Sequence, residues 1–169
     1  MGFASAPSPP LYDAVVGLGS NLGDRAHTLE RATEALGRLE GTRLVARSRF
    51  RETAPVGGPP QGPFLNGALR LATSLGPEAL LARLLELEAR FGRERRERWG
   101  PRTLDLDLLW VEGVVRASPG LTLPHPRLHE RLFALEPLVE VAPGARHPAT
   151  GEAYASVLVR LRSAARRGP

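Results

Sequence analysis

The spacing of apolar side chains along the chain predicts an ordered series of strands and helices. Short apolar runs and apolar–polar alternation indicate strands, whereas apolar residues three and four positions apart indicate helices. On these criteria we expect strands at residues 12–18, 44–50, 64–74 and 103–110, then a turn at 112–113 with a short return strand within 110–115. We expect helices at residues 29–39, 77–91, 129–139 and 152–166. The order β, α, β, β, α, β, then a small hairpin and further helices, predicts an α+β fold: a ferredoxin-like α/β sandwich with a largely antiparallel sheet and helices packed on it.

We expect one folded domain behind a short tail. Residues 1–10 are rich in Pro, Ser and Ala and lack the segments of a signal peptide, so they should form a flexible tail before a single domain at 11–169. No apolar run approaches the roughly 20 residues of a membrane span. The chain has no cysteine. That excludes a disulfide framework and a thiolate metal site, and favours a cytoplasmic location.

The basic residues are all arginine, which limits what the net charge indicates about binding partners. The formal net charge is +5, and the 23 basic residues include no lysine. A positive charge predicts an anionic partner, with nucleic acid as the general candidate. Exclusive use of arginine indicates coding bias, so the positions of arginines are more informative than their number. Without lysine, a Walker-type phosphate-binding loop is excluded.

Two aspartates in a predicted strand are the strongest indication of chemistry. Asp105 and Asp107 alternate with leucines, so both carboxylates should project from one face of the strand, about 7 Å apart. Aspartate is depleted in strands. Mg²⁺ prefers oxygen ligands and is usually held by one or two carboxylates together with substrate phosphates. We therefore predict a metal site here, rather than a strand that shows its acids to water.

A run of charged residues precedes this strand. Residues 93–98 read Arg-Glu-Arg-Arg-Glu-Arg and contain no apolar side chain. Guanidinium groups bind phosphate oxygens in pairs. Arginines beside carboxylates that hold a metal are the usual equipment for phosphoryl transfer. These residues alone predict a Mg²⁺-dependent enzyme that acts on phosphate anhydrides, with a solvated loop that closes over a triphosphate, and they leave the acceptor open.

The helix at 77–91 places one carboxylate unfavourably. Leu84 and Leu85 are expected on its apolar face. Glu88 falls in its last turn, where the helix dipole disfavours negative charge. We therefore expect a compensating partner for Glu88.

Two loops border the predicted strands. The segment Gly17-x-Gly19-x-x-x-Gly23 is one residue off the dinucleotide-binding spacing. We interpret it as a structural strand-to-helix turn rather than a phosphate cradle. Residues 53–63 form a long loop rich in Gly and Pro, and long loops in compact domains are usually functional. Asn66 lies at the mouth of that loop.

Three segments together resemble one family. Residues 98–107 read Arg-Trp-Gly-Pro-Arg-Thr-Leu-Asp-Leu-Asp, residues 17–24 read Gly-Leu-Gly-Ser-Asn-Leu-Gly-Asp, and residues 123–127 read Leu-Pro-His-Pro-Arg, with Arg131 and Phe133 after them. They resemble the 6-hydroxymethyl-7,8-dihydropterin pyrophosphokinases of the folate pathway, in the family's order and over residues 14–143. The resemblance implies an α/β sandwich with extra helices. It also implies that ATP gives its terminal pyrophosphoryl group to the hydroxymethyl oxygen of the dihydropterin and that AMP is released.

The resemblance further implies the roles of individual residues. The implied catalytic residues are Arg93, Arg102, Asp105 and Asp107, of which the two aspartates would bind two Mg²⁺ ions. The implied ATP-binding residues are Arg93, Arg95, Trp99, Arg102, Leu108, His125 and Arg131, with Leu108 against the adenine. The implied pterin-binding residues are Thr53, Pro55, Val56, Phe64, Asn66, Trp99 and Phe133, with the ring between the two phenylalanines and Trp99 closing above it. The segment between Gly92 and Trp99 is one residue shorter than the family pattern, which leaves open whether Arg93, Arg95 or Arg96 reaches phosphate.

Two other classes stay open on the residues alone. An RNA-binding module shares this element order, but it requires exposed aromatics on the central strands and no paired acids there. An NADP-dependent oxidoreductase rests only on the glycine segment. The partners implied by the resemblance are ATP and hydroxymethyldihydropterin, with no nucleic acid and no membrane, and we expect a monomer.

Overall fold

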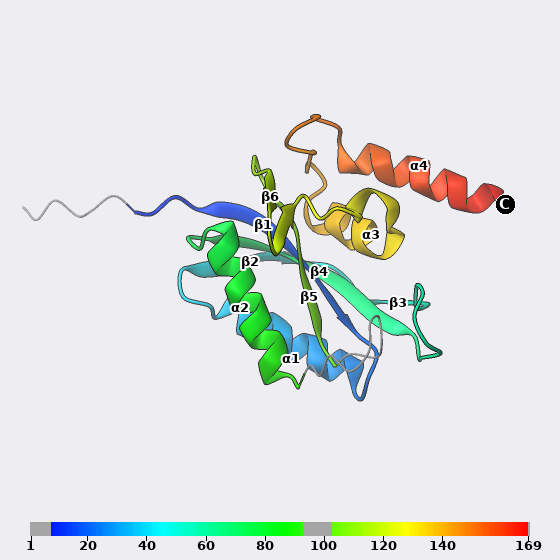
Figure 1. Cartoon of the computed structure of the whole chain (residues 1–169), viewed down its shortest axis with the longest axis horizontal. Helices are drawn as coiled ribbons and strands as arrows, with labels where there is room; N and C mark the ends of the chain where they lie inside the picture. The colour runs from blue at the N-terminus through cyan, green and yellow to red at the C-terminus, as the bar shows by residue number, and fades with distance from the viewer. Residues whose placement is uncertain (1–7, 93–102, 169) are drawn as a thin grey trace, which may run out of the picture.

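The computed structural model describes residues 8–92 and 103–168 (Figure 1). The predictions made for most of the N-terminal tail and for the arginine-rich loop at 93–98 therefore lie outside the described residues. No helix in the described part is long and apolar enough to cross a membrane.

The elements follow the predicted order. The strands are β1 (Tyr12–Ser20), β2 (Thr42–Arg47), β3 (Arg51–Thr53), β4 (Phe64–Thr73), β5 (Asp105–Val111), β6 (Arg116–Ser118) and β7 (Leu121–Leu123). The helices are α1 (Arg25–Gly37), α2 (Pro77–Arg90), the short 3₁₀ helix η1 (Leu128–Glu130), α3 (Leu132–Val141) and α4 (Tyr154–Arg167).

The main sheet is antiparallel throughout its described pairings. Its strands lie in the order β2-β4-β1-β5, and β3 pairs with the start of β4. The central strand β1 places Gly19 opposite Asn66 of β4 and, on its other edge, opposite Asp105 of β5. Gly17 lies opposite Asp107 in the same way. Residues far apart in the sequence are thus brought into one row across three strands.

Helices cover both faces of the sheet, as Figure 1 shows. Alternation along β1 sends Val16 into a core with α1 and α2, and Val15 into a second core with α3 and α4. The first core contains Leu84 of α2, and the second contains Leu135 of α3. The predicted α+β sandwich is therefore confirmed.

The predicted strand at 44–50 begins earlier in the structure, at Thr42, ends at Arg47, and is followed by a separate strand, β3. The chain leaves β2 at Ser48, whose hydroxyl accepts a hydrogen bond from the Ala68 N–H at 2.9 Å. Phe50 then lies over Gly67, where an added Cβ would come within 2.6 Å of the Phe50 ring. Apolar–polar alternation continues through this bend, so the pattern alone does not reveal it.

Two further expectations need correction. The strand after the turn at Glu112 begins only at Arg116, and it pairs with β7 rather than returning along β5. Leu85 is 48% exposed. The buried stripe of α2 instead includes Glu88, which is 2% exposed.

Candidate active site

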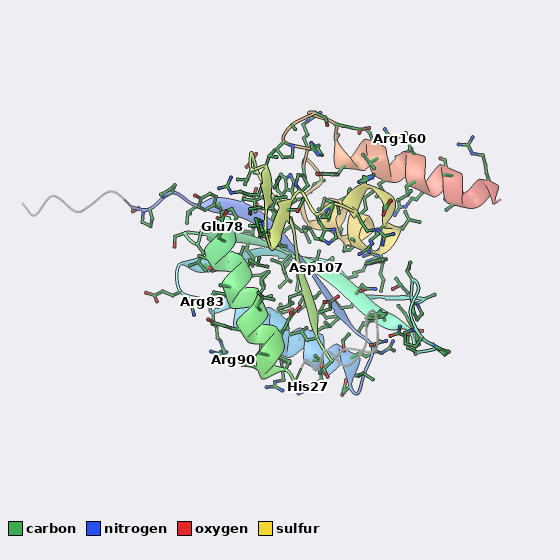
Figure 2. All side chains as sticks on the ribbon, viewed as in Figure 1. His27, Glu78, Arg83, Arg90, Asp107 and Arg160 are labelled. Atoms are coloured by element: carbon green, nitrogen blue, oxygen red, sulfur yellow. The ribbon has the colours of Figure 1, made fainter. Side chains whose placement is uncertain are left out.

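The candidate site begins at the row of residues across β4, β1 and β5. Asp105 and Asp107 share one face of β5, and Asp107 lies near the middle of the molecule in Figure 2. The residues opposite them on β1 are Gly19 and Gly17, which carry no side chain. A Cβ at Gly19 would lie 2.8 Å from the Asn66 amide oxygen. The glycines therefore leave open the floor on which the aspartates and Asn66 meet.

The glycine segment also makes the structural turn that was predicted. β1 continues to Ser20, and Gly23 has a φ of 63°, a conformation that favours glycine. Asp24 then caps α1, accepting a hydrogen bond from the His27 N–H at 3.1 Å. The segment thus shapes the strand and the helix start, and its first two glycines also shape the site.

A cavity of about 250 Å³ opens over this floor. It is lined by Thr53, Ala54, Val56, Gly57, Gln61, Phe64, Asn66, Asp105, Asp107, His125, Arg127, Arg131 and Phe133. Most of these residues are the ones assigned to ATP, pterin or metal from the sequence. The cavity therefore brings together segments that are separated by up to half of the chain.

The wall formed by β3 and β4 has a defined polar contact. Asn66 donates a hydrogen bond from its amide nitrogen to the Thr53 hydroxyl. The Asn21 amide donates to Gln61 at 2.8 Å and so ties the long loop to the end of β1. Gln61 was missed from the sequence, and its only signal was its place in the loop at 53–63.

The opposite wall is the start of α3. The Arg131 guanidinium lies over the Phe133 ring, 5.6 Å from its centre. Burial, and then the charge of Arg127, lower the pKa of Arg131, while the charge of Asp107 acts in the opposite direction. The Arg131 Nε is buried and has no hydrogen-bond partner among the described residues. A half-buried cation in this position favours an anionic ligand.

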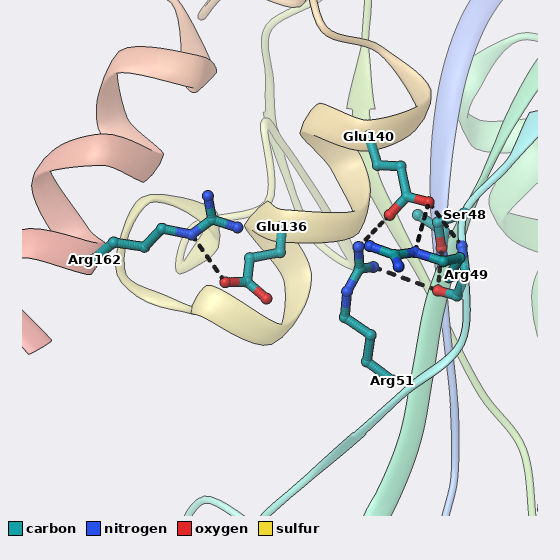
Figure 3. A network of polar contacts seen from close by, with 7 residues as sticks. Ser48, Arg49, Arg51, Glu136, Glu140 and Arg162 are labelled. Carbon is teal, nitrogen blue, oxygen red and sulfur yellow. Dashed lines mark hydrogen bonds and ion pairs between the residues drawn. The ribbon is translucent and has the colours of Figure 1, made fainter.

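A cluster of ion pairs joins these two walls (Figure 3). Glu140 of α3 accepts a hydrogen bond from the Arg49 N–H at 2.9 Å and another from the Arg51 side chain. Arg51 is the first residue of β3, the strand that ends at Thr53. Glu136 and Arg162 connect α3 onward to α4 at 3.1 Å. The spacing between the Thr53 wall and the Phe133 wall therefore depends on contacts outside the cavity.

His125 is held through its main chain and its ring. Its N–H donates to the Leu109 carbonyl at 2.8 Å, and its Nδ1 accepts from the Arg127 N–H at 3.3 Å. Burial, and then the nearby charge of Arg131, lower the pKa of His125 below 6.5. Because the neutral ring uses Nδ1 as an acceptor, Nε2 carries the proton and is the remaining donor.

Some predicted residues are not in the cavity. The side chain of Leu108 is 4% exposed and packs in the core with α1 and α2, on the face of β5 opposite the aspartates. Alternation along the strand therefore points this side chain away from the aspartates, and the expected contact of Leu108 with adenine stays a prediction. Pro55 does not line the cavity, although its neighbours Ala54 and Val56 do.

Other predicted residues cannot be placed, and a second cavity residue besides Gln61 was missed. Arg93, Arg95, Trp99 and Arg102 lie outside the described residues. Arg127 lines the cavity but was not predicted. It closes the family-like segment at residues 123–127, and that position was the signal that could have marked it.

The donor set suits a hard cation that is shared with a ligand. No group of three or more His, Asp or Glu side chains suited to a metal ion occurs among the described residues. Two carboxylates on one face would leave the remaining coordination positions to phosphate oxygens and water. This is the usual arrangement for Mg²⁺.

The sequence matches the family described as 7,8-dihydro-6-hydroxymethylpterin-pyrophosphokinase (HPPK) over residues 15–143. The chain belongs to this family. It is 47% identical over 130 residues to the 2-amino-4-hydroxy-6-hydroxymethyldihydropteridine pyrophosphokinase of Methylorubrum extorquens, covering 77% of this chain and 82% of that protein. It is 42% identical over 137 residues to the Bacillus subtilis protein of the same name, covering 81% and 82%. The activity predicted from the resemblance, pyrophosphate transfer in folate biosynthesis, is thereby confirmed.

The fold is also similar to solved structures. Wild-type HPPK-DHPS of Plasmodium falciparum superposes with a TM-score of 0.72 at 11% identity, covering 96% of this chain and 47% of that chain. The present HPPK thus spans less than half the length of that protein. At this identity the similarity supports the fold alone.

The low pKa of His125 predicts a pH dependence of stability. As the pH falls through 6.5, the ordinary His pKa, the unfolded chain takes up a proton that the folded protein excludes. The unfolding free energy therefore decreases as the pH decreases over this range. This decrease is complete once the pH is below the pKa of His125 in the folded protein. Replacement by Asn keeps an acceptor for the Arg127 N–H but removes the titration. The His125→Asn variant should lose less stability than the parent between about pH 8 and about pH 5 in urea denaturation. If the unfolding free energies of parent and variant change equally with pH, the lowered pKa of His125 is contradicted.

Proposed function

We propose that this HPPK holds the two reacting ends of its substrates over the row formed by Asn66, Gly19 and Asp105. The observation that carries the proposal is this row together with the adjacent pair of Gly17 and Asp107, which places an amide and two carboxylates on the floor of one cavity. ATP would give its terminal pyrophosphoryl group to the hydroxymethyl oxygen of the dihydropterin. The products would be the pterin diphosphate and AMP.

The phosphate end would lie at β5. Asp105 and Asp107 would bind two Mg²⁺ ions, which supply charge neutralisation for the triphosphate when bound. Arg131 and His125 lie beside the aspartates and would donate to phosphate oxygens. Arg127, at the rim of the cavity, adds a further guanidinium. Charge stabilisation and alignment of the reacting oxygens are the main protein contributions to this class of reaction.

The pterin end would lie between the walls. Phe64 and Phe133 both line the cavity and offer ring faces for stacking. Asn66 can donate and accept, which suits a heterocycle with a mixed polar edge. Its hydrogen bond to Thr53 fixes the orientation of the amide before substrate arrives. Val56 and the main chain of residues 53–56 would complete this slot.

The nucleotide end involves residues outside the described part. Arg93, Arg95 and Arg102 would contact the phosphates and Trp99 would cover the pterin, and these roles stay predictions. An adenine contact at Leu108 would have to use its main chain, because the side chain is in the core. The single domain at 11–169, the monomeric state, the cytoplasmic location and the absence of a nucleic-acid partner also stay predictions.

The carboxylate pair can be tested by release of AMP. With ATP, Mg²⁺ and hydroxymethyldihydropterin, Asp107→Ala should lower kcat by about 100-fold to 1,000-fold or more, the effect of losing one group that stabilises the transition state. Asp13→Asn is a matched control, because this aspartate pairs with Arg70 at 2.7 Å near the far end of β1. It should keep near-parent kcat. An Asp107→Ala enzyme with near-parent kcat in Mg²⁺ would show that the metal assignment is wrong.

The role of Asn66 can be tested by comparing the two substrates. Asn66→Ala removes both a donor and an acceptor, so pterin affinity should fall by about 10-fold to 100-fold, equivalent to about 1–3 kcal/mol. Affinity for a non-hydrolysable ATP analogue, measured by calorimetry on the same protein, is the internal control and should change little. Equal losses for both ligands would assign Asn66 a structural role.

A further inference from the structure

Glu88 is a charged side chain in a costly position. It is 2% exposed, and the other buried residues of α2 are all apolar. It lies in the last turn of the helix, where the dipole disfavours a carboxylate. Burial of a charged group adds a further cost unless hydrogen bonds compensate for it. The position therefore needs a specific partner, as the sequence predicted.

One such partner is a main-chain group between the two site aspartates. The Glu88 Oε1 accepts a hydrogen bond from the Leu106 N–H at 2.8 Å. Leu106 separates Asp105 from Asp107, so the contact is made at the midpoint of the carboxylate pair. Its side chain lies in the core with α1 and α2, on the opposite face from the aspartates.

The contact holds β5 on the edge that pairs with no strand within residues 8–92 and 103–168. β5 is the last strand in the order β2-β4-β1-β5. On one edge, β1 pairs with Asp105 through Gly19 and with Asp107 through Gly17. On the other edge, the Leu106 N–H donates to Glu88. The short segment that carries both carboxylates is therefore fixed from both sides, by a strand and by a helix.

We propose that Glu88 is a positioning residue that sets the relative orientation of Asp105 and Asp107 for shared divalent ions. The inference rests on the proposed function of the two aspartates. Ligand constellations must be held within about 0.5 Å of their working geometry. Groups that orient metal ligands usually contribute about 10-fold to 100-fold in metal affinity or activity. A buried acceptor on the intervening peptide group supplies such a constraint.

Two substitutions separate the hydrogen bond from the general packing of α2. Glu88→Met keeps the length of the side chain and removes the acceptor, whereas Glu88→Gln keeps an amide oxygen that can accept from the Leu106 N–H. Thr33→Val is the matched control for loss of a buried polar contact. Thr33 is 4% exposed and its hydroxyl donates to the Leu29 carbonyl of α1 at 2.8 Å, away from the site.

The test measures Mn²⁺ binding by electron paramagnetic resonance in the presence of a non-hydrolysable ATP analogue. Glu88→Met should bind Mn²⁺ about 10-fold to 100-fold more weakly than the parent, with unchanged pterin affinity. The Leu106 amide should also exchange its hydrogen faster in this variant. Glu88→Gln and Thr33→Val should both bind Mn²⁺ as the parent does.

Several results would overturn the inference. Parent-like Mn²⁺ binding in Glu88→Met would show that the hydrogen bond does not position the ligands. An equal loss in Thr33→Val would assign the effect to stability, and an equal loss in Glu88→Gln would assign it to charge. If Glu88→Met fails to fold, Glu88→Asp takes its place, because the shorter side chain withdraws the carboxylate from Leu106 and should weaken Mn²⁺ binding similarly. Asp107→Ala separates the two proposals: if it binds Mn²⁺ normally, the metal site itself is wrong.

Discussion

The antiparallel pairing of β1 with both β4 and β5 is the constraint on which the site depends. Registers on the two edges of β1 place Asn66 and Asp105 opposite the same residue, Gly19. Because glycine has no side chain, groups from two outer strands can approach each other across the central one. A Cβ at Gly19 would come within 2.8 Å of the Asn66 amide oxygen. One register thus brings an amide and a carboxylate from two different strands to the same floor.

Hydrogen bonds outside the cavity then hold the segments that line it. Glu140 joins the strand that leads to Thr53 with the helix that begins beside Phe133. Glu88 joins α2 to the main chain between Asp105 and Asp107. In each case a helix carboxylate binds a main-chain N–H at or near the site. Such contacts limit how far these segments can shift relative to one another, which a preorganised site requires.

Much of this arrangement could be predicted from the sequence, and the exceptions have physical reasons. Alternation of leucine and aspartate gave the shared face of Asp105 and Asp107, because strand periodicity is local. The same periodicity places the Leu108 side chain on the other face of the strand, in the core with α1 and α2. The bend at Ser48 depends on a hydrogen bond to Ala68, and Gln61 enters the site through Asn21. Such long-range contacts leave no periodic signal.

The most direct test of the account is the position of metal and pterin in the substrate complex. Crystals grown with Mn²⁺, a non-hydrolysable ATP analogue and hydroxymethyldihydropterin would locate the metal by its anomalous scattering. The account predicts Mn²⁺ at about 2.1 Å from carboxylate oxygens of both Asp105 and Asp107, with the pterin ring between Phe64 and Phe133 and hydrogen-bonded to Asn66. Metal bound to the nucleotide without either aspartate, or a pterin ring outside the two phenylalanines, would contradict it.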